Sequence, residues 1–470
     1  MKKIYISLLL LGSINTHSQC FTKIESGNYH LTALKSDGTL WGWGFSNWGQ
    51  LNSTPMYPFA EPVPLQLDAA TNWQSMANGG NNSFAIKTNG TLWATGGNNY
   101  GTLGINSTIP QIQIFTQVGT ANWKAISASG EHVIGIQTNG TLWAWGRNDY
   151  NQVGNNTCCS DVLAPVQIST DTDWATIDTS IWGYTIALKT NGTLWGWGKN
   201  EGAFGGSMTT SLAVPTQLST DTDWAEISTL GSHILMVKTN GTLWVFGGGG
   251  TGALGLGSGV TTTYIPLQVG TDNWKSIAGG FFTSFAVKTD GTLWVWGRND
   301  GGQLGLGDTT NRNIPTQIGT DTNWTKVITG RDHTIAIKND GTAYAWGYNN
   351  FASTTLGTFV PAESYYTPIL LPTAMNGVCA VLENERFNIP TNDIILAPNP
   401  TKELTTLKFA TIPENTTVTV YNLLGTKMDS FSTTEQTAYT IDTRQYSAGM
   451  YIVVVATING TTQQFKLIKE

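Results

Sequence analysis

The stretch that decides the fold is Asp290-Gly-Thr-Leu-Trp-Val-Trp-Gly297, one of seven related copies along the chain. Its Asp/Asn-Gly-Thr element recurs at intervals of 49 to 52 residues, with glycines at Gly38, Gly90, Gly140, Gly192, Gly241, Gly291 and Gly341. Asp-Gly or Asn-Gly between two apolar runs favours a type I′ hairpin, because both central residues then adopt positive φ. A period this regular indicates an array of one repeated supersecondary unit.

Each unit has the same internal order of four short apolar segments. It opens on an aromatic residue, and these residues are Phe21, Trp73, Trp123, Trp174, Trp224, Trp274 and Trp324. A Gly-rich turn, a second apolar run, the hairpin and a third run follow, and a loop leads to a fourth segment such as Pro315-Thr-Gln-Ile318. Four short antiparallel strands per repeat are typical of propeller blades. The sequence therefore predicts an all-β chain with a seven-bladed β-propeller at residues 19–376.

Tryptophans and asparagines of the repeat invite two other interpretations. Trp294 and Trp296 form one of four Trp-x-Trp pairs, and such pairs suggest sugar binding. Side chains alternate along a strand, so both rings of a pair lie on the same strand face, where we expect them to pack against the next blade. Asn-x-Thr glycosylation patterns begin at Asn89, Asn139, Asn191 and Asn240, whereas the other three units have Asp at this position. We therefore interpret both features as structural, as core packing and turn chemistry.

The units resemble the repeat of the regulator-of-chromosome-condensation family over roughly residues 20–376. The resemblance rests on Gly330-Arg-Asp-His333, Asp290-Gly-Thr-Leu-Trp-Val-Trp-Gly297 and Gly302-Gln-Leu-Gly-Leu-Gly307. It implies a seven-bladed propeller, in agreement with the repeat count. The best-known member of that family is a nuclear exchange factor for a small GTPase. We do not transfer this activity, since the chain is acidic and is expected to be exported.

The N-terminus is typical of a secretory signal at residues 1–18. Lys2 and Lys3 precede an apolar run, and small and polar residues follow it. A lipoprotein signal ending at Cys20 is the alternative, but Gln19 stands where such a signal needs a small residue. Charged residues make up 12% of the chain and the net charge is −7, which argues against nucleic-acid binding. No stretch of the mature sequence is apolar enough to predict a membrane span.

The repeat period stops near residue 376, and a second domain is expected after a linker at residues 377–392. Six or seven short strands at residues 393–470 predict a small β-sandwich. The landmarks Ala397-Pro-Asn-Pro400, Tyr421-Asn-Leu-Leu-Gly425 and Ala448-Gly-Met-Tyr451 resemble the type A sorting domain of the type IX secretion system. This resemblance implies Sec export, passage across the outer membrane by the type IX machinery, and a secreted or outer-surface location.

No catalytic motif appears in the sequence, and we expect no enzyme activity, cofactor or metal site. Four histidines, at His30, His132, His233 and His333, occupy one repeat position, and we expect each to hydrogen-bond its own turn. The pairs Asp171/Asp173 and Asp221/Asp223 suggest Ca²⁺ ligands or, as we prefer, turn residues. The alternative function is a cryptic hydrolase or lyase with its site in the central channel.

The preferred function is a monomeric, non-enzymatic platform that binds an extracellular protein or glycan. The loop after the third strand carries Trp48, Tyr100, Tyr150 and Phe351 in four units that become neighbours when the ring closes. Exposed aromatic rings supply large, rigid contact areas. We therefore predict a binding arc on one rim, with loop packing as the alternative.

Four cysteines complete the inventory of the sequence. Export through an oxidising compartment permits disulfides. Cys20 opens the first repeat and Cys379 follows the last, so a Cys20–Cys379 bond is predicted to close the ring. Cys158 and Cys159 are adjacent, and we expect no bridge between them because a bond between neighbours is strained.

Overall fold

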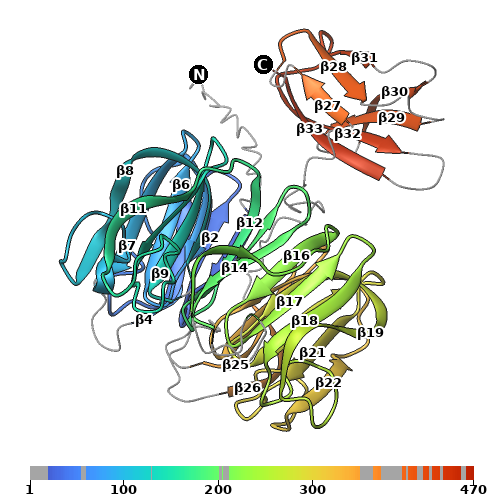
Figure 1. Ribbon diagram of the computed structural model, residues 1–470. Coiled ribbons are helices and arrows are strands. Elements are labelled where there is room, and N and C mark those ends of the chain that lie inside the picture. The colour runs from blue at the N-terminus through green and yellow to red at the C-terminus, as the bar shows by residue number, and fades with distance from the viewer. Residues whose placement is uncertain are drawn as a thin grey trace, which may run out of the picture. The chain divides into compact units, whose positions relative to one another are not determined.

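The described residues of the computed structural model are all-β apart from one short 3₁₀ turn, η1 (Asn99–Gly101) (Figure 1). Contacts divide the chain into two compact parts, Met1–Asn384 and Glu385–Glu470. The structure describes residues 20–53, 60–128, 130–200, 204, 211–349, 364–371, 394–397, 401–409, 416–422, 426–433, 438–456 and 462–469. The expected signal (1–18) and linker (377–392) lie outside these residues. The predicted domain boundaries therefore stay predictions.

Every one of the seven repeat units contributes four strand segments. Units 1 to 3 contain β1 (Phe21–Ser26), β2 (His30–Lys35), β3 (Leu40–Phe45), β4 (Ala60–Gln66), β5 (Trp73–Asn78), β6 (Asn82–Lys87), β7 (Thr91–Gly97), β8 (Gln111–Ala128), β9 (His132–Gln137), β10 (Leu142–Gly146) and β11 (Val162–Ser169). Units 4 and 5 contain β12 (Trp174–Thr179), β13 (Tyr184–Lys189), β14 (Leu194–Gly198), β15 (Leu212–Gln217), β16 (Trp224–Thr229), β17 (His233–Lys238), β18 (Thr242–Gly248) and the start of β19 (Thr262–Gly279). Units 6 and 7 contain the rest of β19, β20 (Thr283–Lys288), β21 (Leu293–Gly297), β22 (Arg312–Gln317), β23 (Trp324–Thr329), β24 (His333–Lys338), β25 (Ala343–Tyr348) and β26 (Ser364–Leu370).

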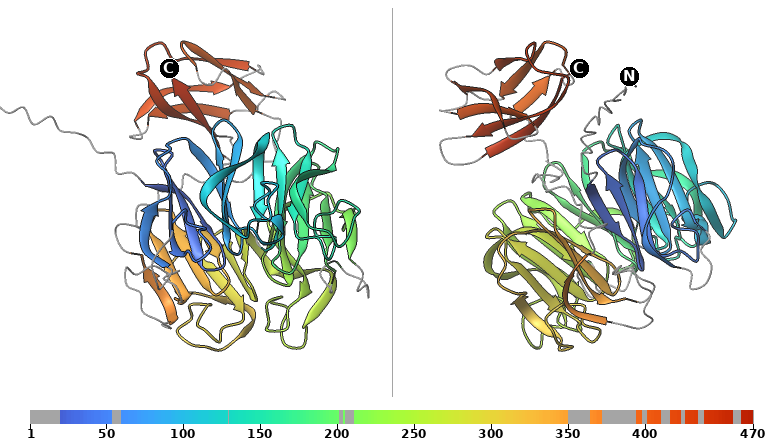
Figure 2. Two further views of the ribbon diagram at one scale, coloured as in Figure 1. Left: turned by 90° about the vertical axis from the view of Figure 1, so that its left-hand side faces the viewer. Right: turned by 180° about the vertical axis from the view of Figure 1, so that it is seen from behind.

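Antiparallel pairing follows chain order within each unit. Three sheets have four strands (β1-β2-β3-β4, β12-β13-β14-β15 and β23-β24-β25-β26), and two have seven. Each seven-stranded sheet joins two units, because the long strand β8 or β19 ends one unit and begins the next. The predicted propeller architecture is therefore present, with consecutive sheets following one another from blue to orange (Figure 2).

The second-to-third-strand hairpins use the predicted Asp/Asn-Gly-Thr residues in all seven units, but they are not the predicted type I′ turns, because only the glycine has a positive φ and the Asp or Asn before it does not. In unit 6 the Asp290 carboxylate accepts hydrogen bonds from the Thr292 amide (2.9 Å) and hydroxyl (2.6 Å), and Gly291 has a φ of +82°. Asn89 makes the same two bonds to Thr91 in unit 2. The four asparagines of the glycosylation pattern are thus used inside their own turns, as the sequence predicted.

The first strand of each unit lies innermost and contacts the first strand of the next, and β23 contacts β1 (Figure 2). One apolar cluster spans this junction, with Phe21, Ile24 and Trp43 from unit 1 packed against Ile328 and Ile335 from unit 7. Burial of such a cluster removes apolar surface from water, which favours closure. Apolar packing across this junction therefore contributes to closing the ring.

Trp-x-Trp pairs pack in the core, as expected. The second ring of each pair is fully buried, and Trp145 illustrates its role. Its indole N–H donates to the Thr102 carbonyl of the preceding unit at 2.8 Å. The first ring, Trp143, is half-buried and donates to the Thr141 hydroxyl at 2.9 Å. These indoles join neighbouring units and do not form a sugar platform.

The C-terminal part consists of two facing sheets. Its strands are β27 (Ile394–Ala397), β28 (Leu404–Phe409), β29 (Thr416–Asn422), β30 (Lys427–Thr433), β31 (Ala438–Asp442), β32 (Gly449–Ala456) and β33 (Thr462–Lys469). They form the sheets β27-β28-β31 and β30-β29-β32-β33. Leu407 and Ile441 from the first sheet share a core with Val418, Val453 and Leu467 from the second. This is the small β-sandwich predicted from the sequence.

Candidate binding surface

One face of the propeller carries two kinds of connection from each unit. The turn between the first and second strands and the loop after the third strand lie at the same end of a unit, because neighbouring strands are antiparallel. We call this end the loop face. The Asp/Asn-Gly hairpins lie at the opposite end, which we call the hairpin face. Trp48, Tyr100 and Tyr150 of the predicted aromatic arc belong to the loop face.

Buried amide side chains fix the loops that carry the arc. In unit 1 the Gln50 side chain, which is fully buried, accepts the Trp48 amide at 3.0 Å. In unit 3 the Gln152 side chain accepts the Tyr150 amide at 2.7 Å. Asn148, also buried, accepts the Val153 amide at 3.1 Å in the same loop. These bonds explain the Gly-Gln-Leu-Gly element of the repeat and hold the arc backbone in place.

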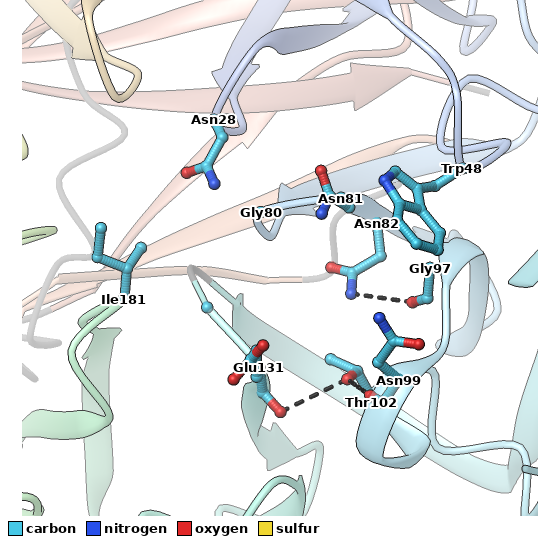
Figure 3. A pocket seen from close by; sticks show the side chains of 11 residues that line it. Asn28, Trp48, Gly80, Asn81, Asn82, Gly97, Asn99, Thr102, Glu131 and Ile181 are labelled. Carbon is cyan, nitrogen blue, oxygen red and sulfur yellow. Dashed lines mark hydrogen bonds between the residues drawn. The ribbon is translucent and has the colours of Figure 1, made fainter. Parts of the chain in front are cut away.

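A cavity of about 270 Å³ opens on the loop face of units 1 to 4 (Figure 3). Trp48 forms one wall, above the backbone of Gly97 (Figure 3). The remaining lining is mostly polar and comes from Asn28, Gly80, Asn81, Asn82, Asn99, Thr102, Gly130, Glu131 and Ile181. Four amides, one hydroxyl, one carboxylate and one indole ring therefore surround a space of small-molecule size. We call this space the Asn pocket.

Asn82 is the most buried amide of the Asn pocket, with 3% of its surface exposed. Its Nδ2 donates to the Gly97 carbonyl at 3.3 Å, while Oδ1 is buried without a hydrogen-bond partner (Figure 3). Asn82 stands at the repeat position that His30 and His132 occupy in the units on either side. An unpaired buried acceptor is uncommon in proteins and is satisfied by an added donor.

A second cavity of about 360 Å³ adjoins the Asn pocket through Asn99. Tyr100, which is 37% exposed, and Asp161 contribute to its lining. The Arg147 guanidinium lies 5.0 Å from the Tyr100 ring centre. Trp48 and Tyr100 of the predicted arc thus border two neighbouring cavities.

Arg147 connects the Tyr100 region to the unit 3 loop. Its guanidinium pairs with Glu131 at 2.5 Å and with Asp149 at 2.8 Å. Burial lowers the pKa of Arg147, but the hydrogen bonds from the two carboxylates outweigh this effect and raise it. The positive charge here is therefore already compensated.

Tyr150 continues the surface and is 42% exposed. The Lys199 ammonium lies 4.7 Å from the Tyr150 ring centre and 5.9 Å from that of Trp182. Trp182 stacks on Phe281 at 5.9 Å, although the two residues belong to units 4 and 6. Sequence reasoning missed Trp182 and Phe281, because they lie in the first turn of their units and not in the loop that defined the arc. Phe351 lies outside the described residues.

Cys158 and Cys159 correct one expectation, because their sulfur atoms are bonded to each other. The backbone accommodates this bond with a φ of +73° at Cys159. Both residues are exposed, and the Cys158 sulfur lies 3.4 Å from the Asp149 carbonyl oxygen in the Tyr150 loop. Local backbone geometry therefore allows a bridge that we had excluded as strained. Cys379 lies outside the described residues, so the Cys20–Cys379 bond stays a prediction.

The repeat histidines also differ from expectation in their partners. All four are buried, and each Nε2 hydrogen-bonds a hydroxyl in the next unit, not its own turn. The pairs are His30–Ser83 (3.0 Å), His132–Thr185 (2.9 Å), His233–Ser284 (2.7 Å) and His333–Ser26 (2.9 Å). Burial lowers the pKa of His132 to about 3 and that of His333 to about 4. These imidazoles are neutral inter-unit links and are unsuited to proton transfer near neutral pH.

Paired aspartates bind lysine side chains. The Lys189 ammonium lies 2.6 Å from Asp171 and 3.1 Å from Asp173, and Lys238 makes the same contacts with the second pair. Lys189 also lies 4.9 Å from the Trp174 ring centre. Within the described part of the chain, no group of three or more His, Cys, Asp or Glu side chains is arranged to hold a metal ion.

Acidic side chains on the inner strands do not favour the channel-enzyme alternative. Asp178 on β12 accepts the amides of Thr179 (2.9 Å) and Thr229 (2.8 Å), and burial raises its pKa to about 7. Glu226 on β16 accepts the Ile277 amide at 3.3 Å. These carboxylates hold the backbone of neighbouring strands. No helix in the described residues is long and apolar enough to cross a membrane.

Comparison with protein families identifies both parts of the chain. Models of the regulator of chromosome condensation (RCC1) repeat match residues 139–178 and 290–337, and also 21–50, 123–152, 274–303 and 324–352. The chain carries RCC1 repeats. A secretion system C-terminal sorting domain matches residues 396–470. This domain supports export by type IX secretion to the cell surface or beyond.

Two curated relatives are similar to this chain over short segments. The chain is 32% identical over 91 residues to the human probable E3 ubiquitin-protein ligase HERC3, covering 19% of this chain and 9% of that protein. It is 34% identical over 92 residues to the mitochondrial RCC1 domain-containing protein RUG3 of Arabidopsis thaliana, covering 20% of each. The matched segment spans a fifth or less of these curated relatives.

Two solved structures are similar in fold to this chain. Human WBSCR16 is similar with a TM-score of 0.63 and 20% identity, covering 71% of this chain and 94% of that one. Prp20p from Saccharomyces cerevisiae is similar with a TM-score of 0.62 and 17% identity, covering 80% and 90%. At these identities the likeness establishes the propeller fold alone.

Proposed function

We propose that the protein is an exported, monomeric, non-enzymatic binding platform, and that the loop face of units 1 to 3 contacts an extracellular protein or glycan. The single observation that carries this proposal is the row of aromatic rings on consecutive loops, the half-buried Trp48 and the exposed Tyr100 and Tyr150, with one cavity beside Trp48 and a second beside Tyr100. Aromatic side chains give large contact areas at low entropic cost, because only two torsions must be fixed.

Rigidity of the loops supports a preformed surface. Gln50 and Gln152 hold the backbone of the arc, so the rings are presented without a folding step. Preorganisation of this kind favours affinity, since less ordering accompanies association. Interaction of the sorting domain at residues 396–470 with the type IX machinery then brings this surface outside the cell.

Substitution of the arc tests the proposal. The full mature chain, wild type and Trp48→Ala/Tyr100→Ala/Tyr150→Ala, is applied to a glycan array and to a panel of immobilised extracellular proteins. Tyr264→Ala is the matched control, because Tyr264 is 50% exposed and lies on β19, away from the loop face of units 1 to 3. We expect the triple variant to lose at least tenfold in affinity for the wild-type ligand, and the control to retain it. Equal binding by all three proteins would contradict the proposal.

Enzyme activity is tested on the same samples. Incubation with glycan and peptide substrates is expected to leave them intact. Turnover that tracks the folded protein and is abolished by Asp178→Asn would revive the channel alternative.

A further inference from the structure

We propose that the Asn pocket binds one neutral sugar residue of a glycan, with the pyranose ring stacked on Trp48. This inference rests on the proposed binding role of the loop face and assigns a ligand class to one cavity in it. The residues that carry it are Asn28, Trp48, Asn81, Asn82, Asn99 and Glu131, all of which line the cavity (Figure 3).

Chemistry of the lining matches hydroxyl groups on an apolar ring. An amide offers one acceptor and two donor hydrogens, which complement a hydroxyl that both donates and accepts. The Trp48 ring supplies a flat apolar wall for the C–H face of a sugar, in the way that aromatic rings present large contact area. Four amides around one indole thus favour a polyhydroxylated, uncharged ring.

Charge in the Asn pocket argues against ionic ligands. Glu131 is the carboxylate of the lining, and Arg147 pairs with it at 2.5 Å. Arg147 is also held by Asp149, so two carboxylates share one guanidinium and the three groups carry a net charge of −1, which disfavours an anionic ligand. An ammonium group would have to compete with Arg147 for the Glu131 carboxylate, whereas a neutral sugar would not.

Asn82 provides the second, independent observation. It is nine-tenths buried or more and lines the cavity, and its Oδ1 lacks a hydrogen-bond partner, so a ligand hydroxyl can donate to it once the amide turns from Gly79 toward the cavity. In unit 3 the equivalent residue, His132, is bonded to Thr185 of unit 4. Between units 2 and 3 both members of this pair differ, because Asn82 of unit 2 replaces the histidine and Val133 of unit 3 replaces the hydroxyl residue. The inter-unit link is thus replaced by an unpaired amide at the place where the cavity lies.

Restoring the repeat pattern gives a variant designed to fold. Asn82→His/Val133→Thr installs the pair seen at His132 and Thr185, whose positions are equally buried. It removes the pocket amide and supplies an inter-unit hydrogen bond instead. Trp48→Ala removes the stacking wall, and Tyr264→Ala again serves as the control. Thermal unfolding of each variant verifies that the propeller is intact.

The probes are the full mature chain on an array of neutral glycans and calorimetric titration with methyl glycosides of hexoses and N-acetylhexosamines. We expect the wild type to bind at least one neutral glycan, and both pocket variants to lose about tenfold or more in affinity, while the control binds normally.

Two results would overturn the sugar assignment. One is glycan binding that survives both pocket variants. The other is the absence of glycan binding together with a protein ligand that depends on Trp48, Tyr100 and Tyr150. The second result would leave the proposed function standing, whereas a ligand insensitive to the whole arc would contradict the proposed function itself.

Discussion

Acidification to pH 5 is predicted to destabilise the propeller strongly through its four buried histidines. Burial lowers their pKa values to about 3 for His30 and His132 and to about 4 for His233 and His333, against about 6.5 in an unfolded chain. A lowered histidine pKa means that the folded state favours the neutral ring. The stabilisation is therefore complete above pH 6.5 and is lost as the pH falls from there toward the folded pKa.

At pH 5, which is about 1.5 pH units below the pKa of an unfolded-state histidine, protonation stabilises the unfolded state by about 2 kcal/mol for each histidine. The buried histidines of the folded state stay almost entirely neutral and gain no comparable stabilisation. Four such groups give about 8 kcal/mol. Asp178 acts in the opposite direction, because burial raises its pKa to about 7 and a raised carboxyl pKa favours the folded state as the pH falls. Between pH 8 and pH 5 the protonation of Asp178 stabilises the folded state by about 3 kcal/mol, so the free energy of unfolding falls by about 5 kcal/mol in total. This is a large share of the stability of a typical domain.

Urea unfolding followed by tryptophan fluorescence measures this loss. All 19 tryptophans lie between Trp41 and Trp346, so the signal reports on the repeats and not on the C-terminal sandwich. His132→Gln keeps a polar side chain but does not titrate, and is expected to shrink the difference between pH 8 and pH 5 by about 2 kcal/mol. Lys124→Gln, an exposed position on β8, is expected to leave the difference unchanged. Equal wild-type midpoints at the two pH values would refute the reasoning.

Three further predictions concern export and the cysteines. Deletion of residues 393–470 is expected to leave a folded propeller in the periplasm, as measured by fractionation and immunoblotting; surface or medium localisation of the truncated chain would contradict it. Thiol labelling of the native exported protein is expected to leave Cys158 and Cys159 unmodified until reductant is added, and Ser at both positions is expected to change unfolding free energy by less than about 0.5 kcal/mol, since the bridge closes no long loop. Non-reducing peptide mapping is expected to recover a peptide that joins Cys20 to Cys379; thiols at both positions would exclude this ring closure.

Features of the fold that depend on local chemistry could be predicted from the sequence. The place of the Asp290-Gly-Thr292 turn, though not its type, is one example, because its hydrogen bonds join residues two positions apart. Burial of Trp145 and its equivalents followed from strand alternation and from the need of a blade to pack on both faces. In both cases the repeat itself supplied seven observations of one environment.

Features that depend on contacts between units were not predicted. The partner of His132 is Thr185, which lies in the next unit, and no single-unit pattern identifies it. The Asn pocket arises where side chains of four units meet, so Trp48 was found but Asn82 was not. The missing signal lies in a comparison of neighbouring units. Three of the four repeat histidines are paired with a hydroxyl residue one position further on in the next unit, and at Asn82 and Val133 both members of this pair are replaced. The Cys158–Cys159 bond depends on a positive φ that the sequence does not specify.

Hydrogen–deuterium exchange of the full mature chain, with and without the ligand retained on the array or protein panel, tests the central claim most directly. The account predicts slower exchange on ligand binding in the loops at residues 45–53, 97–110 and 146–161, which carry Trp48, Tyr100 and Tyr150. It predicts no change in the hairpins around Gly38, Gly90 and Gly140 on the opposite face of the same units. Protection of those hairpins, with the loops unchanged, would contradict the assignment of the loop face as the binding surface.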